Sequence, residues 1–66
     1  MDIKIDTYNV IIEYDGADEF LKEYCKQNDI RLLRISENYC KQNKEIFLNE
    51  LIKFIEDDYE KYKELY

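Results

Sequence analysis

The first fifteen residues alternate apolar and polar side chains in two short runs, and this alternation constrains the fold more than any other feature. A period of two is typical of strands that bury one face of a sheet. A turn centred on residues 8–9 pairs Ile5 with Ile12 and collects the apolar side chains on one face. A loop one residue longer or shorter would move one strand's apolar side chains to the opposite face. We therefore predict strands over residues 2–6 and 10–15, joined by a loop of even length.

After Gly16 the apolar residues recur at intervals of three and four, which is the periodicity of a helix. This spacing predicts a helix over residues 17–28. Asp15 is placed to cap its start, and Asn28 is placed to end it in a left-handed conformation.

The stretch IRLLRIS predicts a third strand over residues 31–35, joined to the second strand by a right-handed helical crossover. The remaining apolar residues and tyrosines recur at helical spacing and predict a long helix over residues 43–65. The predicted fold class is α+β. It is a small ββαβα domain with a three-stranded mixed sheet, and both helices pack on the face that bears Ile5, Val10 and Ile12.

Length and composition indicate that the predicted strands and helices form one domain over residues 1–66. The chain has one glycine and no proline, so it has little material for linkers, and its hydrophobic fraction of 45% is that of a folded domain. The first residues lack the apolar run of a signal peptide, and no segment is long enough to span a membrane. We expect a cytoplasmic protein with Cys25 and Cys40 as free thiols.

The pentapeptide YCKQN occurs twice, at Tyr24–Asn28 and at Tyr39–Asn43. The residues that flank the two copies differ, and no longer repeat accompanies them. Two cysteines in a chain without histidine fall short of the four ligands of a structural zinc site. We interpret the repetition as a coincidence of composition.

The net charge of −6 indicates what kind of partner the chain suits. An acidic domain repels nucleic acid over most of its surface and suits a basic protein partner. We therefore do not expect direct nucleic-acid binding. One local basic patch is predicted from Arg31, Arg34, Lys41 and Lys44.

The segments IIEYDG and FLKEYCKQNDIRLLRI resemble the core of restriction-endonuclease-like nuclease domains, of the PD-(D/E)xK and very-short-patch-repair type. Such domains are common in phages and mobile elements, and the resemblance covers residues 3–55. It implies that Asp6, Glu13 and Asp15 are ligands of a catalytic Mg²⁺ ion, which would activate water and stabilise a phosphoryl transition state. The predicted hairpin register places these three carboxylates on one face of the sheet.

The chain departs from the nuclease pattern at its centre. It has no histidine, and Asp15 stands where the family has a lysine. Lys4 is also placed to neutralise the carboxylates without a metal. These departures favour a core that has no cofactor and no catalytic activity.

Two functional hypotheses follow. The first is a small acidic, non-catalytic binding protein of a phage or mobile element, which inhibits a host nucleic-acid-handling defence protein as anti-CRISPR and anti-restriction proteins do. The alternative is a minimal nuclease that depends on Mg²⁺ or Mn²⁺ and uses Asp6, Glu13 and Asp15. The partner-binding residues predicted for the first are Glu56, Asp57, Asp58, Tyr59, Tyr62 and Tyr66. We also expect a homodimer in which the final helix takes part through Phe54 and the tyrosines.

Overall fold

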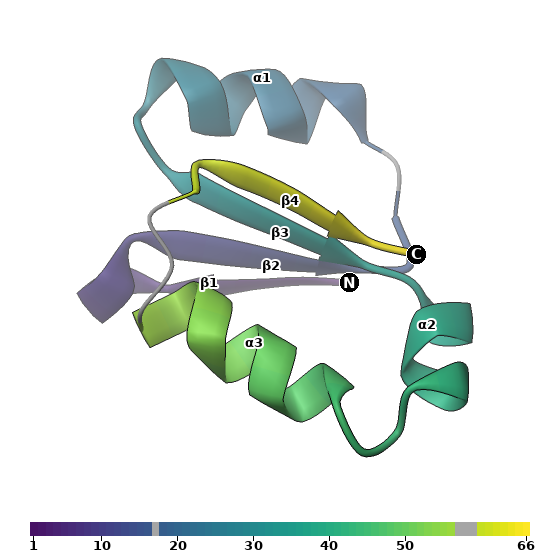
Figure 1. The fold of residues 1–66 in the computed structure, drawn as a ribbon. Coiled ribbons are helices and arrows are strands. Elements are labelled where there is room, and N and C mark those ends of the chain that lie inside the picture. The colour runs from purple at the N-terminus through teal and green to yellow at the C-terminus, as the bar shows by residue number, and fades with distance from the viewer. Residues whose placement is uncertain (17, 57–59) are drawn as a thin grey trace.

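Figure 1 shows the computed structural model of the chain, which describes residues 1–16, 18–56 and 60–66. The elements are β1 (Asp2–Ile5), the 3₁₀ turn η1 (Asp6–Tyr8), β2 (Val10–Tyr14), α1 (Glu19–Gln27), β3 (Arg31–Ile35), α2 (Glu37–Gln42), α3 (Phe47–Glu56) and β4 (Tyr62–Leu65). The strands form one mixed sheet in the order β1-β2-β3-β4. β1 is antiparallel to β2, whereas β2, β3 and β4 are parallel. The α+β class is confirmed, and the structure adds a fourth strand and a third α-helix to the predicted elements.

In the β1–β2 hairpin the strand side chains lie on their predicted faces, but the register of the pairing differs from the prediction. Ile5 lies opposite Val10, and Ile3 lies opposite Ile12, which is a shift of two residues from the predicted pairing. The shift arises because η1 and Asn9 form a four-residue loop, closed by Asn9 in the left-handed conformation with φ 52°. An even shift leaves every side chain on its predicted face.

The two ends of α1 differ from the predicted caps. Its N-cap is Asp18, whose carboxylate accepts a hydrogen bond of 2.9 Å from the Phe20 amide. Asp15 therefore lies too far upstream to cap this helix. At the other end Asn28 has a φ of −103°, and the next residue, Asp29, takes the left-handed conformation with a φ of 53°.

The single long helix predicted over residues 43–65 is wrong. α2 begins after Ser36, whose hydroxyl accepts a hydrogen bond of 3.0 Å from the Tyr39 amide, and α3 ends at Glu56. The last described residues form β4, which pairs with the open edge of β3. Helical spacing of tyrosines is a local preference, and pairing with a strand distant in the sequence overrides it here.

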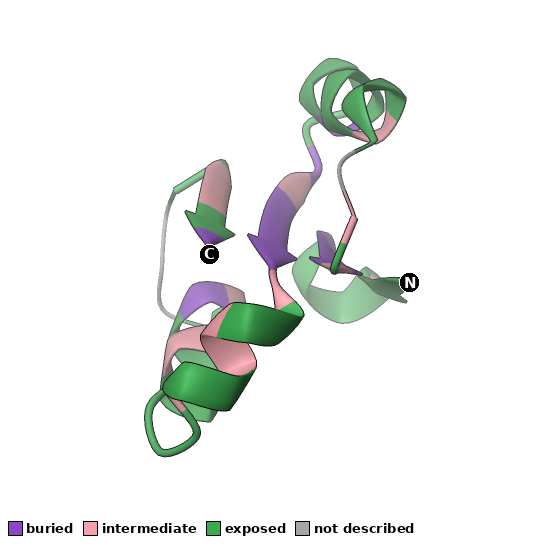
Figure 2. Cartoon of the chain, turned by 90° about the vertical axis from the view of Figure 1, so that its right-hand side faces the viewer, coloured by how far each residue is buried: buried purple, intermediate pink, exposed green. Residues whose placement is uncertain are grey.

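The helices cover opposite faces of the sheet, which corrects the prediction that they share one face (Figure 2). α1 packs on one face through a cluster of Ile11, Cys25, Ile30 and Leu32. α2 and α3 pack on the other face, whose buried cluster is Val10, Ile12, Leu33, Ile35, Phe54 and Leu65. The strands allow this because β2 and β3 each bury adjacent apolar residues, as strands covered on both sides do.

The two crossover connections therefore differ in hand. Both step in the same direction across the sheet, from β2 to β3 and from β3 to β4, yet their helices lie on opposite faces. The β2–α1–β3 unit is right-handed, as predicted (Figures 1 and 2). The return through α2 and α3 is consequently left-handed, whereas about 98% of such connections are right-handed.

Both copies of YCKQN end a helix in the same way. The side-chain amide of Asn28 donates a hydrogen bond of 2.8 Å to the carbonyl of Tyr24, and Asn43 donates one of 3.0 Å to the carbonyl of Tyr39. The backbone amide of each asparagine donates to the same carbonyl. The pentapeptide is a repeated helix terminator, at the end of α1 and again at the end of α2.

Candidate functional site

A buried ion pair lies on the face of the sheet that α1 covers. Glu13 of β2 and Arg34 of β3 are opposite each other in the parallel register. Arg34 Nε lies 2.6 Å from Glu13 Oε1, and both side chains are only 3% exposed. Neither atom has a hydrogen-bond partner among the described residues, so this contact is an ion pair without hydrogen-bond geometry.

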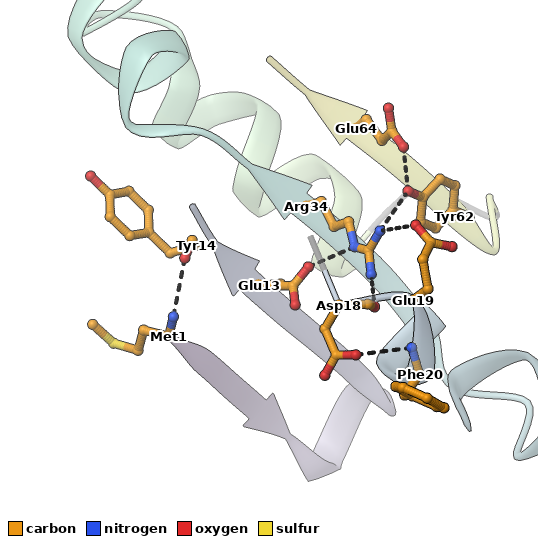
Figure 3. A network of polar contacts seen from close by, with 9 residues as sticks. All are labelled: Met1, Glu13, Tyr14, Asp18, Glu19, Phe20, Arg34, Tyr62 and Glu64. Carbon is orange, nitrogen blue, oxygen red and sulfur yellow. Dashed lines mark hydrogen bonds and ion pairs between the residues drawn. The ribbon is translucent and has the colours of Figure 1, made fainter. Parts of the chain in front are cut away.

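The guanidinium of Arg34 also reaches three other residues, at the start of α1 and in β4 (Figure 3). It donates to the backbone carbonyl of Asp18 at the start of α1 and lies 3.6 Å from the carboxylate of Glu19. On the other side it donates a hydrogen bond of 3.5 Å to the hydroxyl of Tyr62 in β4. Arg34 therefore ties two neighbouring strands and the first turn of α1 to β3.

The ionisation of this network follows from burial and from the neighbouring charges. Burial opposes the charge of Arg34, but Glu13 and Tyr62 outweigh that effect, so the pKa of the guanidinium lies above its ordinary value. Burial, assisted by a hydrogen bond to Glu64, raises the pKa of Tyr62 to about 12. At neutral pH Tyr62 is therefore a neutral phenol that donates to the carboxylate of Glu64.

Gly16 leaves room for the carboxylate of Glu13. A Cβ atom at position 16 would lie 2.8 Å from Glu13 Cδ and 2.9 Å from both Cγ and Oε2. A Cβ atom essentially never comes this close to an atom to which it is not bonded, so a larger residue at this position would push the side chain of Glu13 out of its place beside Arg34. Gly16 is needed here for the close approach of a side chain, since its own φ is not positive.

Exposed carboxylates gather above this network, where the three parallel strands end. Because the carboxyl ends of parallel strands meet at the same edge of a sheet, residues that follow β2 and β3 lie beside the end of β4. We call this group the acidic edge, and its exposed members are Asp15, Asp18, Glu19, Glu37 and Glu64. Asp15 lies next to the start of α2, because its carboxylate accepts a hydrogen bond of 3.5 Å from the Glu37 amide. The connections from β2 and β3 leave this edge toward opposite faces, which is the arrangement where open sheets bind ligands.

The three carboxylates predicted as metal ligands do not come together. Asp6 begins η1, is 93% exposed and pairs with Lys4 at 3.1 Å. Glu13 lies near the other end of the hairpin, where it pairs with Arg34, and Asp15 contacts the start of α2. Within residues 1–16, 18–56 and 60–66, no three acidic or cysteine side chains are arranged to hold a metal ion.

The residues of the predicted basic patch are also dispersed. Arg34 is buried against Glu13, and Lys41 pairs with Glu37 at 3.1 Å. Arg31 lies on the opposite face of β3, where it donates to the backbone carbonyls of Phe54 and Ile55 and closes the end of α3. The remaining member, Lys44, is exposed in the connection between α2 and α3.

The predicted partner-binding residues do not form a helical stripe. Tyr62 is half-buried in β4 and faces α1, Tyr66 is 56% exposed after β4, and Glu56 is exposed at the end of α3. Asp57, Asp58 and Tyr59 lie outside the described residues. Phe54, which was expected at a dimer contact, is completely buried under the sheet.

The sequence did not indicate a basic hollow on the α1 side of the sheet, near the start of β4. It has a volume of about 340 Å³ and is lined by Lys22, Cys25, Lys26, Asp29, Ile30, Leu32, Lys61 and Tyr62. Lys61 pairs with Asp29 at 2.7 Å, and the ammonium of Lys22 lies 4.5 Å from the ring centre of Tyr62. Three lysines, Lys22, Lys26 and Lys61, therefore gather at this hollow near the amino ends of β3 and β4.

The function of this chain has to be inferred from its own surfaces. Over the part of the chain that the structure describes, no helix has the length and apolar character needed to cross a bilayer. No family model, curated protein or solved structure matches the chain.

Proposed function

We propose that the chain is a small, non-catalytic binding protein whose acidic edge occupies the basic groove of a nucleic-acid-binding protein. By the nuclease resemblance, such a partner belongs to the host defence proteins that phages and mobile elements inhibit. The charge of the surface carries the proposal. Net charge is −6, and among the described residues exposed carboxylates outnumber exposed lysines.

The local arrangement supports the acidic edge as the contact surface. The two arginines of the chain are directed inward, Arg34 to Glu13 and Arg31 to the end of α3, and among the described residues the one outer carboxylate paired with an arginine is Glu19, at 3.6 Å from Arg34. The Arg34 network also fixes the first turn of α1, which carries Glu19, to the sheet. Carboxylates on a rigid support bind a cationic groove with little loss of conformational entropy.

The partner suited to this surface is a protein with a lysine- and arginine-lined groove. Electrostatic complementarity of this kind increases the association rate and weakens steeply with salt. The chain would then compete directly with the nucleic acid that the groove normally binds.

The test uses two variants with the same net charge. The first neutralises part of the acidic edge through Asp15→Asn, Glu19→Gln, Glu37→Gln and Glu64→Gln. The control neutralises four exposed acids elsewhere through Asp6→Asn, Glu23→Gln, Glu45→Gln and Glu56→Gln. Each changes the net charge from −6 to −2. Asparagine suits position 15 because that residue has a φ of 54°.

The assay measures displacement of a labelled nucleic acid from each basic protein that the immobilised chain retains. We expect the wild type and the control variant to displace the label equally and the acidic-edge variant to need at least tenfold more protein. Equal weakening of both variants would show that only net charge matters. Retained proteins that keep their nucleic acid would contradict the proposal. Plasmid cleavage with Mg²⁺ or Mn²⁺ that Asp6→Ala and Glu13→Ala abolish would support the nuclease alternative instead.

A further inference from the structure

An apolar groove remains open on the face of the sheet that carries α2 and α3. The groove has a volume of about 290 Å³ and is lined by Met1, Ile3, Ile12, Tyr14, Ile35, Cys40, Phe47 and Leu51. Met1 is 77% exposed and Ile3 is 50% exposed, so the β1 side of this face is only partly covered. No lining residue carries a charged side chain.

One flank of α3 forms an apolar ridge beside this groove. Leu48 is 53% exposed and Ile52 is 49% exposed, and they lie one helical turn apart. On the opposite flank Glu50 pairs with Lys63 of β4 at 3.5 Å, which fixes how the helix is turned about its axis. Because successive helix residues are about 100° apart, Leu48 and Ile52 lie on the flank of α3 that faces away from β4.

We infer that this groove and ridge form a homodimer interface, in which the ridge of each copy fills the groove of the other. The groove and the ridge lie side by side on one face. A two-fold axis that passes between them therefore places the ridge of each copy in the groove of the other. The surface named by this inference is Met1, Ile3, Leu48 and Ile52 together with the groove, and we call it the open apolar surface. It excludes the buried Phe54 that the sequence suggested.

A second copy fits this surface better than other occupants do. The side chains that line the groove offer no charge to a basic protein or a nucleic acid, whereas the ridge of another copy matches them in apolar character. A standard interface buries roughly 800 Å² per partner, which is about a sixth of the 4689 Å² surface of this chain. Large exposed apolar patches on small domains mark interaction sites. The inference is independent of the proposed function, because the acidic edge is a different set of residues.

The test is sedimentation of the full chain over a concentration range from about 1 to 500 μM, with Ile52→Glu and Ile3→Lys as variants. We expect the wild type to approach twice its mass of 8.2 kDa and each variant to dissociate at least 100-fold more readily. Phe20→Glu is the matched control, since Phe20 is 88% exposed on α1 on the other side of the sheet. This control should dimerise like the wild type.

Alkylation of Cys40 gives a second readout at the same surface, because this half-buried thiol lines the groove. Its rate should fall with rising concentration of the wild type and of Phe20→Glu, and stay constant in Ile52→Glu. Circular dichroism shows which variants are folded. If either Ile52→Glu or Ile3→Lys is unfolded, the result is taken from the other. A monomeric wild type over the whole range overturns the inference and leaves the surface to another occupant. A dimer that survives Ile52→Glu and Ile3→Lys, or that Phe20→Glu disrupts, also overturns it.

Discussion

Replacing the buried ion pair by apolar residues should cost less than removing either partner alone. Arg34→Met leaves the carboxylate of Glu13 buried without its cation, and Glu13→Leu leaves the guanidinium without its anion. Breaking a buried pair costs about 3–5 kcal/mol. At 0.05–0.15 kcal/mol per residue, the whole domain has a stability of roughly 3–10 kcal/mol. Either single substitution should therefore remove a large part of the free energy of unfolding.

The double variant Glu13→Leu/Arg34→Met removes both charges together. It still loses the charged hydrogen bond from Arg34 to the carbonyl of Asp18, which is worth about 1.5–3 kcal/mol. We therefore expect a net cost of about 1.5–3 kcal/mol, which is smaller than the cost of Arg34→Met alone.

Urea unfolding followed by circular dichroism measures the four corners of this cycle. The expected result is strong non-additivity, with the second substitution rescuing the first. Independent sites add to within about 0.5 kcal/mol. If the double variant equals the sum of the two singles within that margin, the two side chains are not coupled and the role given to the pair is wrong.

Three further predictions concern local structure. Gly16→Ala should lower the free energy of unfolding by about 1–3 kcal/mol in urea, because the new methyl group overlaps a buried carboxylate. Between pH 10 and about 12 the unfolded state should lose the proton of Tyr62 before the folded state does, so the free energy of unfolding should fall as pH rises through this window. Thermal melting of Tyr62→Phe should show a smaller fall over the same window. Asn28→Ala and Asn43→Ala should each cost about 1 kcal/mol in the same urea assay, whereas Asn49→Ala, within α3, should change stability by less.

The facing of side chains in the hairpin was predictable because it depends only on local alternation. The strand β4 was not, because its partner is the open edge of β3, some thirty positions earlier in the chain. Tyr62 and Leu65 are three residues apart and fit a helix equally well. The local pattern carries no information about whether the open edge of β3 pairs with another strand.

The Glu13–Arg34 pair left a signal in the sequence that was missed. β2 contains Ile11-Ile12-Glu13 and β3 contains Leu32-Leu33-Arg34, each with two buried apolar residues followed by a charge. In a parallel register the opposite charges meet. The metal hypothesis grouped Glu13 with Asp6 and Asp15 instead, because the resemblance to nuclease domains implied a shared metal ion.

The two arginines of β3 make this strand the common support of both helical layers. Arg34 holds the start of α1 on one face, and Arg31 holds the end of α3 on the other, with its guanidinium 4.4 Å from the ring centre of Phe54. A fluctuation that withdraws β3 from the sheet therefore releases both helices at once. Because both helical layers are anchored to this strand, the domain should lose its amide protection against hydrogen exchange in one cooperative step.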